Sequence, residues 1–218
     1  MTYEYDYPRP AVSVDCAVFS PVERNLEILL IQRGQPPFQG KWATPGGFVE
    51  IDEPIANAAY RELTEETGME EVDLVEYGVF GTPGRDPRGR TVAVAHWGLT
   101  HSGDHELAAA DDAAEFGWFE VDDLPGLAFD HDDLVADALR ALRNRARTRP
   151  VGRGMIDEPF QMAELVALYE SILGRKVDAR RLSQTALGAG FVDRDDSGAY
   201  VFVGSIYDRL VDEPVTPF

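Results

Sequence analysis

Three glutamates within five residues, Glu62, Glu65 and Glu66, form the group in this chain best suited to chemistry. They lie in the stretch RELTEETGM, residues 61–69. On a helix, positions i, i+3 and i+4 are neighbours, and like charges there destabilise the helix by about 0.2–0.5 kcal/mol per pair. Solvent can screen that repulsion, whereas a cation among the carboxylates would turn it into attraction. The spacing alone therefore leaves two alternatives, a solvent-screened helix face or a site for a cation.

These glutamates belong to a longer pattern, GGFVEIDEPIANAAYRELTEETGM, over residues 46–69. Its glycines, acids and arginine are spaced as in the signature of the Nudix hydrolases, which the stretch resembles at every specified position. At about one chance in fifteen per fixed position, such a match arises at random about once in 10⁸ starting points. The resemblance implies an enzyme that attacks a diphosphate with water, assisted by a divalent metal ion.

The resemblance also implies roles for individual residues of the pattern. The implied ligands of Mg²⁺ (or Mn²⁺) are three carboxylates and one backbone carbonyl, those of Glu62, Glu65, Glu66 and Gly46. The glycine pair permits the approach of that carbonyl because glycine has no Cβ. Arg61 and Glu53 are implied as a pair that fixes the loop against the helix.

The group that takes a proton from the attacking water is left open by the sequence. Some Nudix hydrolases use a glutamate of the signature, here Glu65 or Glu66, and others use an acid on a later loop. The stretch DDAAE offers Asp111, Asp112 and Glu115. We favour Asp112 as a general base, and the alternative is that this acidic stretch is solvated surface. A metal ion also lowers the pKa of bound water, which weakens the need for a strong base.

A second group of side chains suits the recognition of a nucleotide. The loop GTPGRDPRGR carries Arg85, Arg88 and Arg90, and clustered arginines bind phosphate or ribose unless they are simply solvated. This loop and the lead-in GKWATPGGFVE resemble the ADP-ribose pyrophosphatase branch of the Nudix proteins. The resemblance also suggests a phosphate contact by Arg33. Two aromatic residues before the signature can either stack on a base or pack in the core: Phe38 and Trp42.

A scaffold of strands and helices must position these residues. Apolar and β-branched runs predict strands at 11–20, 26–34, 74–80, 90–100 and 115–121. We expect a helix capped by Asp52 and ended by Gly68, and a long helix from about Asp132. The stretch QPPFQGKWATPGGFVE excludes regular structure before Phe48, because of its prolines and glycines. This alternation predicts an α/β fold, the α/β/α sandwich of the Nudix proteins, over residues 1–149.

Residues 150–218 follow a different pattern, which begins near the basic stretch NRARTRPVGRG. Two amphipathic helices, at about 161–174 and 178–190, precede the hairpin FVDRDDSGAYVFV. Helix, turn, helix and hairpin is the order of a winged helix-turn-helix domain. Its second helix would present Arg180, Arg181 and Gln184 to double-stranded DNA. The alternative is a small domain that shields an enzyme or forms its dimer.

The composition of the chain limits the kinds of partner and the cellular environment that we expect. With 39 Asp and Glu against 20 Lys and Arg, the net charge is −19, which argues against binding to anionic membranes or coating nucleic acid. Few lysines and many acids are typical of proteins from high internal salt, although a GC-rich genome also favours arginine. No run approaches the roughly 18 apolar residues of a membrane helix. Cys16 is the only cysteine, so we expect a reducing, cytoplasmic setting.

The four histidines show no metal-ligand spacing. We expect His96 to pack within its strand and the other three to lie on loop surfaces: His101, His105 and His131. The sequence therefore assigns no catalytic or metal-binding role to histidine.

Over nearly its whole length the chain resembles the Nudix-related transcriptional regulators of NAD metabolism. In that family the Nudix pocket senses ADP-ribose and the tail binds operator DNA as a homodimer, and several members have a damaged signature. The signature is intact here, which favours hydrolysis. We therefore expect a homodimeric enzyme that cleaves a nucleoside diphosphate derivative, with ADP-ribose yielding AMP and ribose 5-phosphate. The alternative is a DNA-binding regulator that responds to ADP-ribose.

Overall fold

The computed structural model describes residues 6–70, 72–104 and 113–212. The chain divides into two compact units, one formed by Met1–Phe19 with Ile28–Ala138 and the other by Ser20–Glu27 with Leu139–Phe218. This division falls inside a helix, earlier than the boundary near Pro150 that the sequence suggests. The reason lies in side chains at the end of that helix that bind the tail: Arg143 of the helix donates to the carbonyl of Ile172, and Arg149, one residue beyond the helix, donates to that of Val211, each at 3.1 Å.

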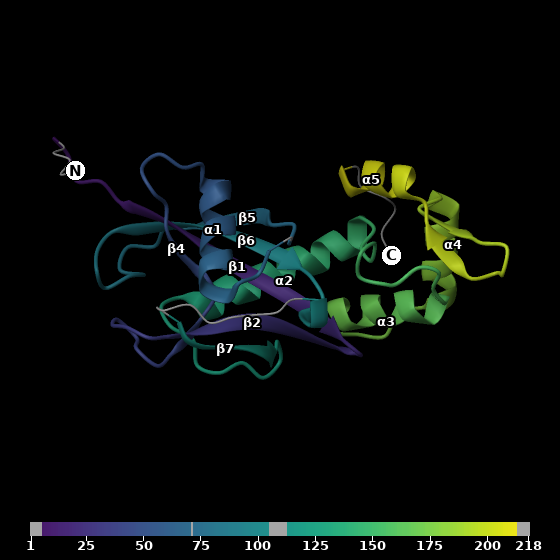
Figure 1. Cartoon of the computed structure of the whole chain (residues 1–218), viewed down its shortest axis with the longest axis horizontal. Coiled ribbons are helices and arrows are strands. Elements are labelled where there is room, and N and C mark those ends of the chain that lie inside the picture. Colours follow the sequence, from purple (N-terminus) through teal and green to yellow (C-terminus); the bar gives the residue numbers. More distant parts are fainter. Residues whose placement is uncertain (1–5, 71, 105–112, 213–218) are drawn as a thin grey trace. The chain divides into compact units, whose positions relative to one another are not determined.

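The first unit is built on a mixed β-sheet (Figure 1). Its strands are β1 (Ala11–Val22), β2 (Asn25–Arg33), β3 (Trp42–Ala43), β4 (Gly46–Phe48), β5 (Val75–Phe80), β6 (Thr91–Leu99) and β7 (Ala113–Glu120). The order is β3-β2-β1-β6-β5, while β4 pairs with β1 and β7 pairs with β2. Strands β1 and β6 are parallel, whereas β4 and β5 run antiparallel to their partners.

The strands β1, β2, β5, β6 and β7 occupy the apolar runs in which strands were predicted. The expectation that no regular structure precedes Phe48 is wrong, because two short strands lie there. Ala43 of β3 pairs with Ile31, and Phe48 of β4 pairs with Ser13. These pairings are long-range, so the local preferences of proline and glycine do not reveal them.

Helix α1 (Ile55–Thr67) carries the glutamates of the signature. Its N-cap is Pro54, with an extended backbone, and not Asp52 as predicted. Proline suits this place because it lacks the N–H that a helix start leaves unpaired. Gly68 ends the helix as predicted, in a left-handed conformation with φ 71°, and its N–H donates to the carbonyl of Thr64 at 2.8 Å.

One face of α1 packs against β1 and fixes how the glutamates are presented. The contacting cluster joins small and branched side chains of both elements: Ala58, Ala59, Leu63, Val14, Cys16 and Val18. Because successive side chains of a strand point to opposite faces, Asp15 faces away from the α1 side of the sheet. Asp15 and the residues packed on α1 therefore belong to opposite faces of β1.

The long helix α2 (His131–Thr148) begins one residue before its predicted start, and a short 3₁₀ turn covers Ser102–Asp104. The second unit follows with α3 (Met162–Leu173), α4 (Ala179–Ala189), β8 (Val192–Arg194), β9 (Tyr200–Phe202) and α5 (Gly204–Asp212). The helix, helix and hairpin of the tail are present as predicted, whereas α5 was not expected. Within the described ranges, no helix combines the length and apolar character needed to cross a membrane.

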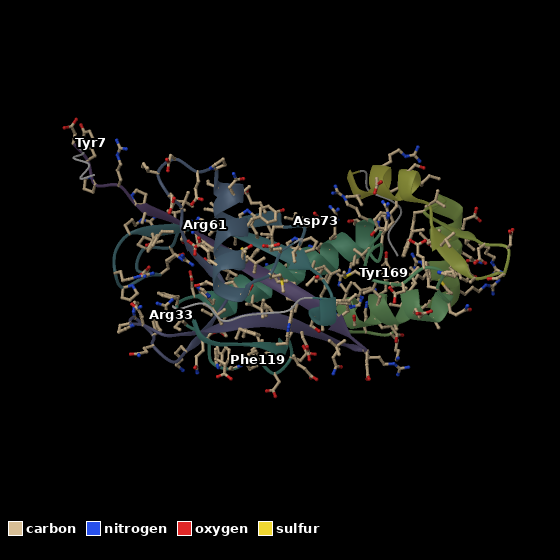
Figure 2. All side chains as sticks on the ribbon, in the orientation of Figure 1. Tyr7, Arg33, Arg61, Asp73, Phe119 and Tyr169 are labelled. Atoms are coloured by element: carbon tan, nitrogen blue, oxygen red, sulfur yellow. The ribbon has the colours of Figure 1, made fainter. Side chains whose placement is uncertain are left out.

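The second unit has its own core around three fully buried aromatic side chains: Phe160, Tyr169 and Phe191 (Tyr169 is labelled in Figure 2). Asp178 caps α4 as predicted, since its carboxylate accepts from the N–H groups of Arg180 and Arg181 at 3.0 Å. The polar hairpin turn closes on Asp195, whose Oδ1 accepts from the backbone of Ser197 and Ala199.

Candidate functional site

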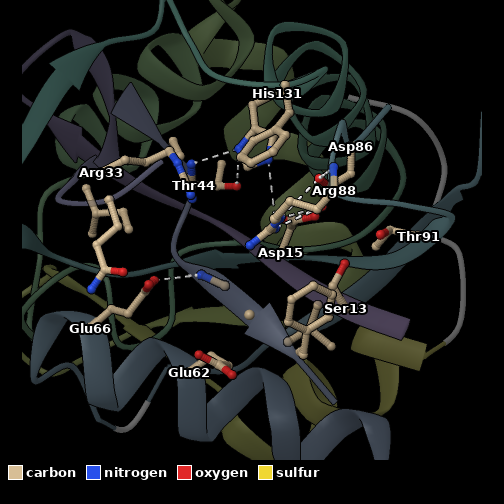
Figure 3. A pocket seen from close by; sticks show the side chains of 18 of the residues that line it. Ser13, Asp15, Arg33, Thr44, Glu62, Glu66, Asp86, Arg88, Thr91 and His131 are labelled. Atoms are coloured by element: carbon tan, nitrogen blue, oxygen red, sulfur yellow. Dashed lines mark hydrogen bonds and ion pairs between the residues drawn. The ribbon is translucent and has the colours of Figure 1, made fainter. Parts of the chain in front are cut away.

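A cavity of about 270 Å³ lies in the first unit and brings together residues from distant parts of the sequence (Figure 3). Glu62 and Glu66 of α1 line one side of it. Arg33, Arg85 and Arg88 also line it, from the end of β2 and from the loop between β5 and β6. The structure thus gathers two signature acids and three predicted arginines around one space.

Arg61 is the centre of the hydrogen bonds beside this cavity, on α1 (Figure 2). Its Nε and Nη2 donate to the two oxygens of Glu53 at 3.1 and 2.6 Å. Its Nη1 donates to Glu62 at 2.8 Å and to Glu65 at 3.0 Å, and its Nη2 also donates to the carbonyl of Phe48 at 3.1 Å. The predicted Arg61–Glu53 pair is therefore present, and it ties the preceding loop to the helix.

Glu66 reaches back from α1 to the glycine pair. Its Oε2 accepts from the N–H of Gly46 at 2.8 Å, yet burial raises the pKa of Glu66 to about 8. Burial also raises the pKa of Glu62, against the opposing effect of Arg61. Both carboxyls would gain from a nearby cation, because a positive charge favours the ionised form.

The glycine pair permits this close approach. A Cβ on Gly46 would lie 2.1 Å from the carbonyl oxygen of Val14, so a side chain there would push the loop away from β1. A Cβ on Gly47 would lie 2.4 Å from the carboxylate of Glu62 and would displace that side chain from its present position. Glycine is therefore required at residue 46, and at residue 47 it leaves room for Glu62.

The donors around this glycine pair suit Mg²⁺, because all of them are oxygens. In the described part of the chain, however, no three His, Cys, Asp or Glu side chains are already gathered around one ion position. Arg61 holds Glu62 and Glu65, and Glu66 holds Gly46. The residues fit such an ion by chemistry and by place, and binding would exchange these hydrogen bonds for metal contacts.

A buried polar cluster lies at another part of the cavity. Arg85 donates to both oxygens of Asp130, at 2.9 and 2.7 Å, and lies 3.6 Å from Asp15. His131 lies 3.5 Å from Asp15 through Nε2, and its Nδ1 accepts from the N–H of Thr44 at 3.1 Å. The predicted phosphate ligand Arg85 is thus held by a carboxylate, with its side chain only 6% exposed.

The expected surface position of His131 is wrong, because the start of α2 turns its ring into this cluster and leaves it 5% exposed. Burial lowers the pKa of His131, and Nδ1 accepts a backbone N–H, so the neutral ring carries its proton on Nε2. His96 is buried within β6, as expected.

Phe129, which the sequence did not single out, organises the arginines that line the cavity. The guanidinium of Arg33 lies 4.8 Å from the centre of its ring, and that of Arg88 lies 5.7 Å away. Phe38 contacts the same ring edge-on at 4.8 Å, so this predicted stacking residue lies beside the arginines. Phe129 and Phe38 both have positive φ, 55° and 63°, which is strained for aromatic residues.

The two arginines differ in how they are held. Arg33 donates through Nε to the carbonyl of Pro37 at 2.8 Å, and burial, followed by the charge of Arg88, lowers its pKa. Arg88 pairs with Asp86 through Nε and Nη2, at 2.8 to 3.1 Å. Two cations brought close enough to oppose each other's charge form a natural place for an anion.

The remaining candidate residues either lie away from this cavity or fall outside the residues that the structure describes. Trp42 packs edge-on against Phe119 at 4.6 Å and is absent from the cavity lining, which agrees with the core-packing alternative. Asp111 and Asp112 lie outside the described residues. The candidate DNA-binding residues all lie on α4 in the second unit: Arg180, Arg181 and Gln184.

Of the site residues that the sequence did not single out, only Asp15 left a trace. A charge in the middle of the apolar run AVSVDCAVF is unusual, and such an acid in a strand interior calls for a buried partner. Phe129, His131 and Thr44 left none, because their neighbours lie far away in the sequence.

Comparison with known proteins agrees with this geometry. Residues 9–139 match the NUDIX domain. The ADPR responsive transcriptional repressor NtrR of Acinetobacter baylyi is 34% identical over 88% of this chain and 78% of its own. The ADP-ribose pyrophosphatase of Methanocaldococcus jannaschii is 42% identical over 62% of this chain and 76% of its own.

Among solved structures, Shewanella oneidensis NrtR complexed with a 27mer DNA superposes with a TM-score of 0.77 and 25% identity, covering 90% of this chain and 95% of that one. The predicted fold class, an α/β Nudix domain followed by a C-terminal domain, is confirmed. With its signature folded around the glycine pair and the family match covering residues 9–139, this chain belongs to the Nudix family.

Proposed function

We propose that this protein is a Mg²⁺-dependent hydrolase that cleaves the diphosphate of ADP-ribose into AMP and ribose 5-phosphate. The observation that carries the proposal is the cavity itself, in which Glu62 and Glu66 face a space also lined by Arg33 and Arg88. A site that cleaves a diphosphate needs acids to bind metal ions and arginines to bind the phosphates, and this cavity has both. The similarity to an ADP-ribose pyrophosphatase supports this choice of substrate.

The residues divide the work of the reaction. When bound, the metal ions neutralise the diphosphate and lower the pKa of the attacking water. Arg33 and Arg88 hold phosphate oxygens and counter their charge. Arg61 keeps the loop and helix in register through Glu53, so that Gly46 and Glu66 stay together.

The proton of the attacking water passes to a carboxylate. Glu66, which hydrogen-bonds to Gly46 beside the cavity, is the first candidate, and Glu65 is the more exposed alternative. Asp112 remains a third candidate. A panel of Glu65→Gln, Glu66→Gln and Asp112→Asn variants separates them. Loss of the general base should lower kcat the most and leave the affinity for substrate unchanged.

The test is release of AMP from ADP-ribose in Mg²⁺, at low and at molar salt. We expect turnover by the wild type and a loss of at least about 100-fold in Glu66→Gln, the usual scale for a lost acid–base or metal-binding group. Glu70→Gln is the matched control, since Glu70 follows the helix, is exposed and does not line the cavity. Absence of turnover at both salt concentrations would refute the proposal that the protein hydrolyses ADP-ribose.

A second function, an ADP-ribose-responsive repressor that binds DNA as a homodimer, is supported by one specific observation. The similarity to the repressor NtrR covers 88% of this chain and so includes the tail. In the tail, α4 carries Arg180, Arg181 and Gln184, as a recognition helix would.

Two measurements separate the functions. Light scattering gives the mass in solution and tests the homodimer. An Arg180→Ala, Arg181→Ala variant should lose binding to operator-like duplexes and retain AMP release, whereas Glu66→Gln should do the reverse. Equal DNA binding by the arginine variant and the wild type would remove α4 as the DNA-reading element.

A further inference from the structure

Asp15 is a buried carboxylate on the wall of the cavity. Its side chain lies on the face of β1 that points away from the core beneath α1. Its neighbours Val14 and Cys16 pack towards α1, so the alternation of β1 turns Asp15 to the other face. There it is 6% exposed and lines the cavity (Figure 3). A charged side chain so buried is rarely left without strong partners.

Among the described residues, Asp15 has two partners, Arg85 and His131, and both lie near the outer limit of an ion pair. The nearest cation, Arg85, lies 3.6 Å from Asp15 but only 2.7 Å from Asp130, with which it forms a two-pronged pair. His131 lies 3.5 Å from Asp15 and is neutral, because burial lowers its pKa. Arg85 is therefore shared between two carboxylates, and Asp130 holds it more closely than Asp15 does.

The geometry points to Asp15 as a specificity-determining residue that accepts a hydrogen bond from a neutral donor of the bound nucleotide, a sugar hydroxyl or an exocyclic amine. This inference rests on the proposed binding of ADP-ribose in the cavity. The carboxylate repels phosphate, so the diphosphate belongs on the side of Arg33 and Arg88, and an uncharged polar part of the ligand belongs beside Asp15.

The surroundings prepare Asp15 for such a donor. Arg85 and His131 approach it from the protein side and hold its orientation, while Thr44, bound to His131 Nδ1, fixes the ring. An ordered acceptor discriminates strongly, because a ligand without the donor leaves a buried charge unpaired. Asp15 is thus a sensor of a single ligand group and takes no part in bond cleavage.

Binding of ADP-ribose, measured by calorimetry with Ca²⁺ in place of Mg²⁺ and with AMP release monitored, tests the inference. Two analogues identify the donor: one has hypoxanthine in place of adenine and so lacks the exocyclic amine, and the other has 2-deoxyribose as its terminal sugar. We expect the wild type to bind one of them about 10- to 100-fold more weakly than ADP-ribose, the scale of one hydrogen bond to a charged group.

Asp15→Asn should bind ADP-ribose more weakly by the same factor and should no longer distinguish that analogue. The matched control is Asp86→Asn, which removes another buried carboxylate of the same cavity but leaves Asp15, Arg85 and Asp130 in place. It should retain the discrimination. Circular dichroism establishes that both variants are folded, and the wild-type comparison of analogues needs no variant at all.

Two results would overturn the inference while leaving the proposed function intact. One is equal binding of ADP-ribose and both analogues by the wild type. The other is an equal loss of affinity for all three ligands in Asp15→Asn, which would leave the discrimination intact and show that Asp15 only supports Arg85. Failure of the wild type to bind ADP-ribose would instead remove the proposed function, and this inference with it.

Discussion

Phe129 shows how one side chain can govern a site without touching the chemistry. Its ring lies beside the guanidinium groups of Arg33 and Arg88, and a cation over a ring gains about 0.5–2 kcal/mol. Its φ of 55° costs energy that the surrounding packing must offset. Such strain is typical of functional sites, and here it accompanies an aromatic ring that contacts two arginines of the cavity.

Phe129→Leu should therefore raise the KM for ADP-ribose by about 10-fold, from the loss of cation–π support on the arginines, with a smaller change in kcat. Phe129→Tyr keeps the ring and the same backbone demand, so it should restore wild-type KM. Steady-state kinetics of AMP release measures both. An unchanged KM in the leucine variant would mean that the arginines hold their places without the ring.

His131 links pH to stability. Its folded-state pKa is lowered by burial, so between that value and about 6.5 the unfolded chain binds a proton that the folded chain does not. Stability is therefore complete above about pH 6.5 and falls as the pH drops below it, by up to about 1.4 kcal/mol per pH unit for this group.

His131→Gln should flatten that decline below about pH 6.5, although His96, whose pKa burial also lowers, retains its own share. The measurement is chemical denaturation at a series of pH values. If the variant and the wild type lose stability with the same slope, protonation of His131 does not drive the decline.

At the scale of elements, the sequence predicts the presence and the end of helix α1 correctly, but it misplaces the start. The apolar spacing of Ala58, Ala59 and Leu63 and the stop at Gly68 were readable in the sequence. The cap was misplaced, because Asp52 is a good capping residue by type, yet the chain enters the helix through Pro54. Local residue preferences indicate several possible helix starts, and the path of the backbone in the folded chain determines which one is used.

The site was predictable as far as its residues lie in one motif. The glycine pair, Glu62, Glu66 and the Arg61–Glu53 pair come from one stretch of sequence, and the structure brings them together. The cluster of Asp15 with Arg85 and His131 joins β1, a distant loop and the start of α2, so no local spacing announces it. Short strands β3 and β4 escaped notice for the same reason.

Gly68 offers a test at this scale. It ends α1 with φ 71°, a conformation that costs a side chain about 1 kcal/mol. Gly68→Ala should lower the free energy of unfolding by about that amount, while AMP release persists at temperatures where the variant is folded. Gly89→Ala is the control, because it has no positive φ and open space around its Cβ. Equal stability of both variants would show that α1 can end without a left-handed residue.

At the scale of the whole molecule, charge dominates. Residues 1–149 carry 28 acidic and 13 basic side chains, and residues 150–218 carry 11 and 7. Self-repulsion of this size weakens a folded chain, and salt relieves it because the screening length falls to about 3 Å at 1 M.

The melting temperature should therefore rise steadily from 0.1 M to molar KCl, as in a protein adapted to high internal salt, and the rise should be as large in NaCl at equal ionic strength. Differential scanning calorimetry measures it. A melting temperature that stays constant or falls would assign the acidic composition to solubility alone.

Arg61 gives α1 a built-in counter-ion. One guanidinium already partly neutralises the carboxylates of Glu53, Glu62 and Glu65, so an arriving metal ion would take over carboxylates that already have a cationic partner. Metal binding then becomes an exchange with a small net gain, unlike structural metal sites that fold with their ion. Chelation by EDTA should abolish AMP release and lower the melting temperature by only a few degrees, and a collapse of the fold on chelation would contradict this. The protein would thus hold its shape through any shortage of metal and resume work when the ion returns.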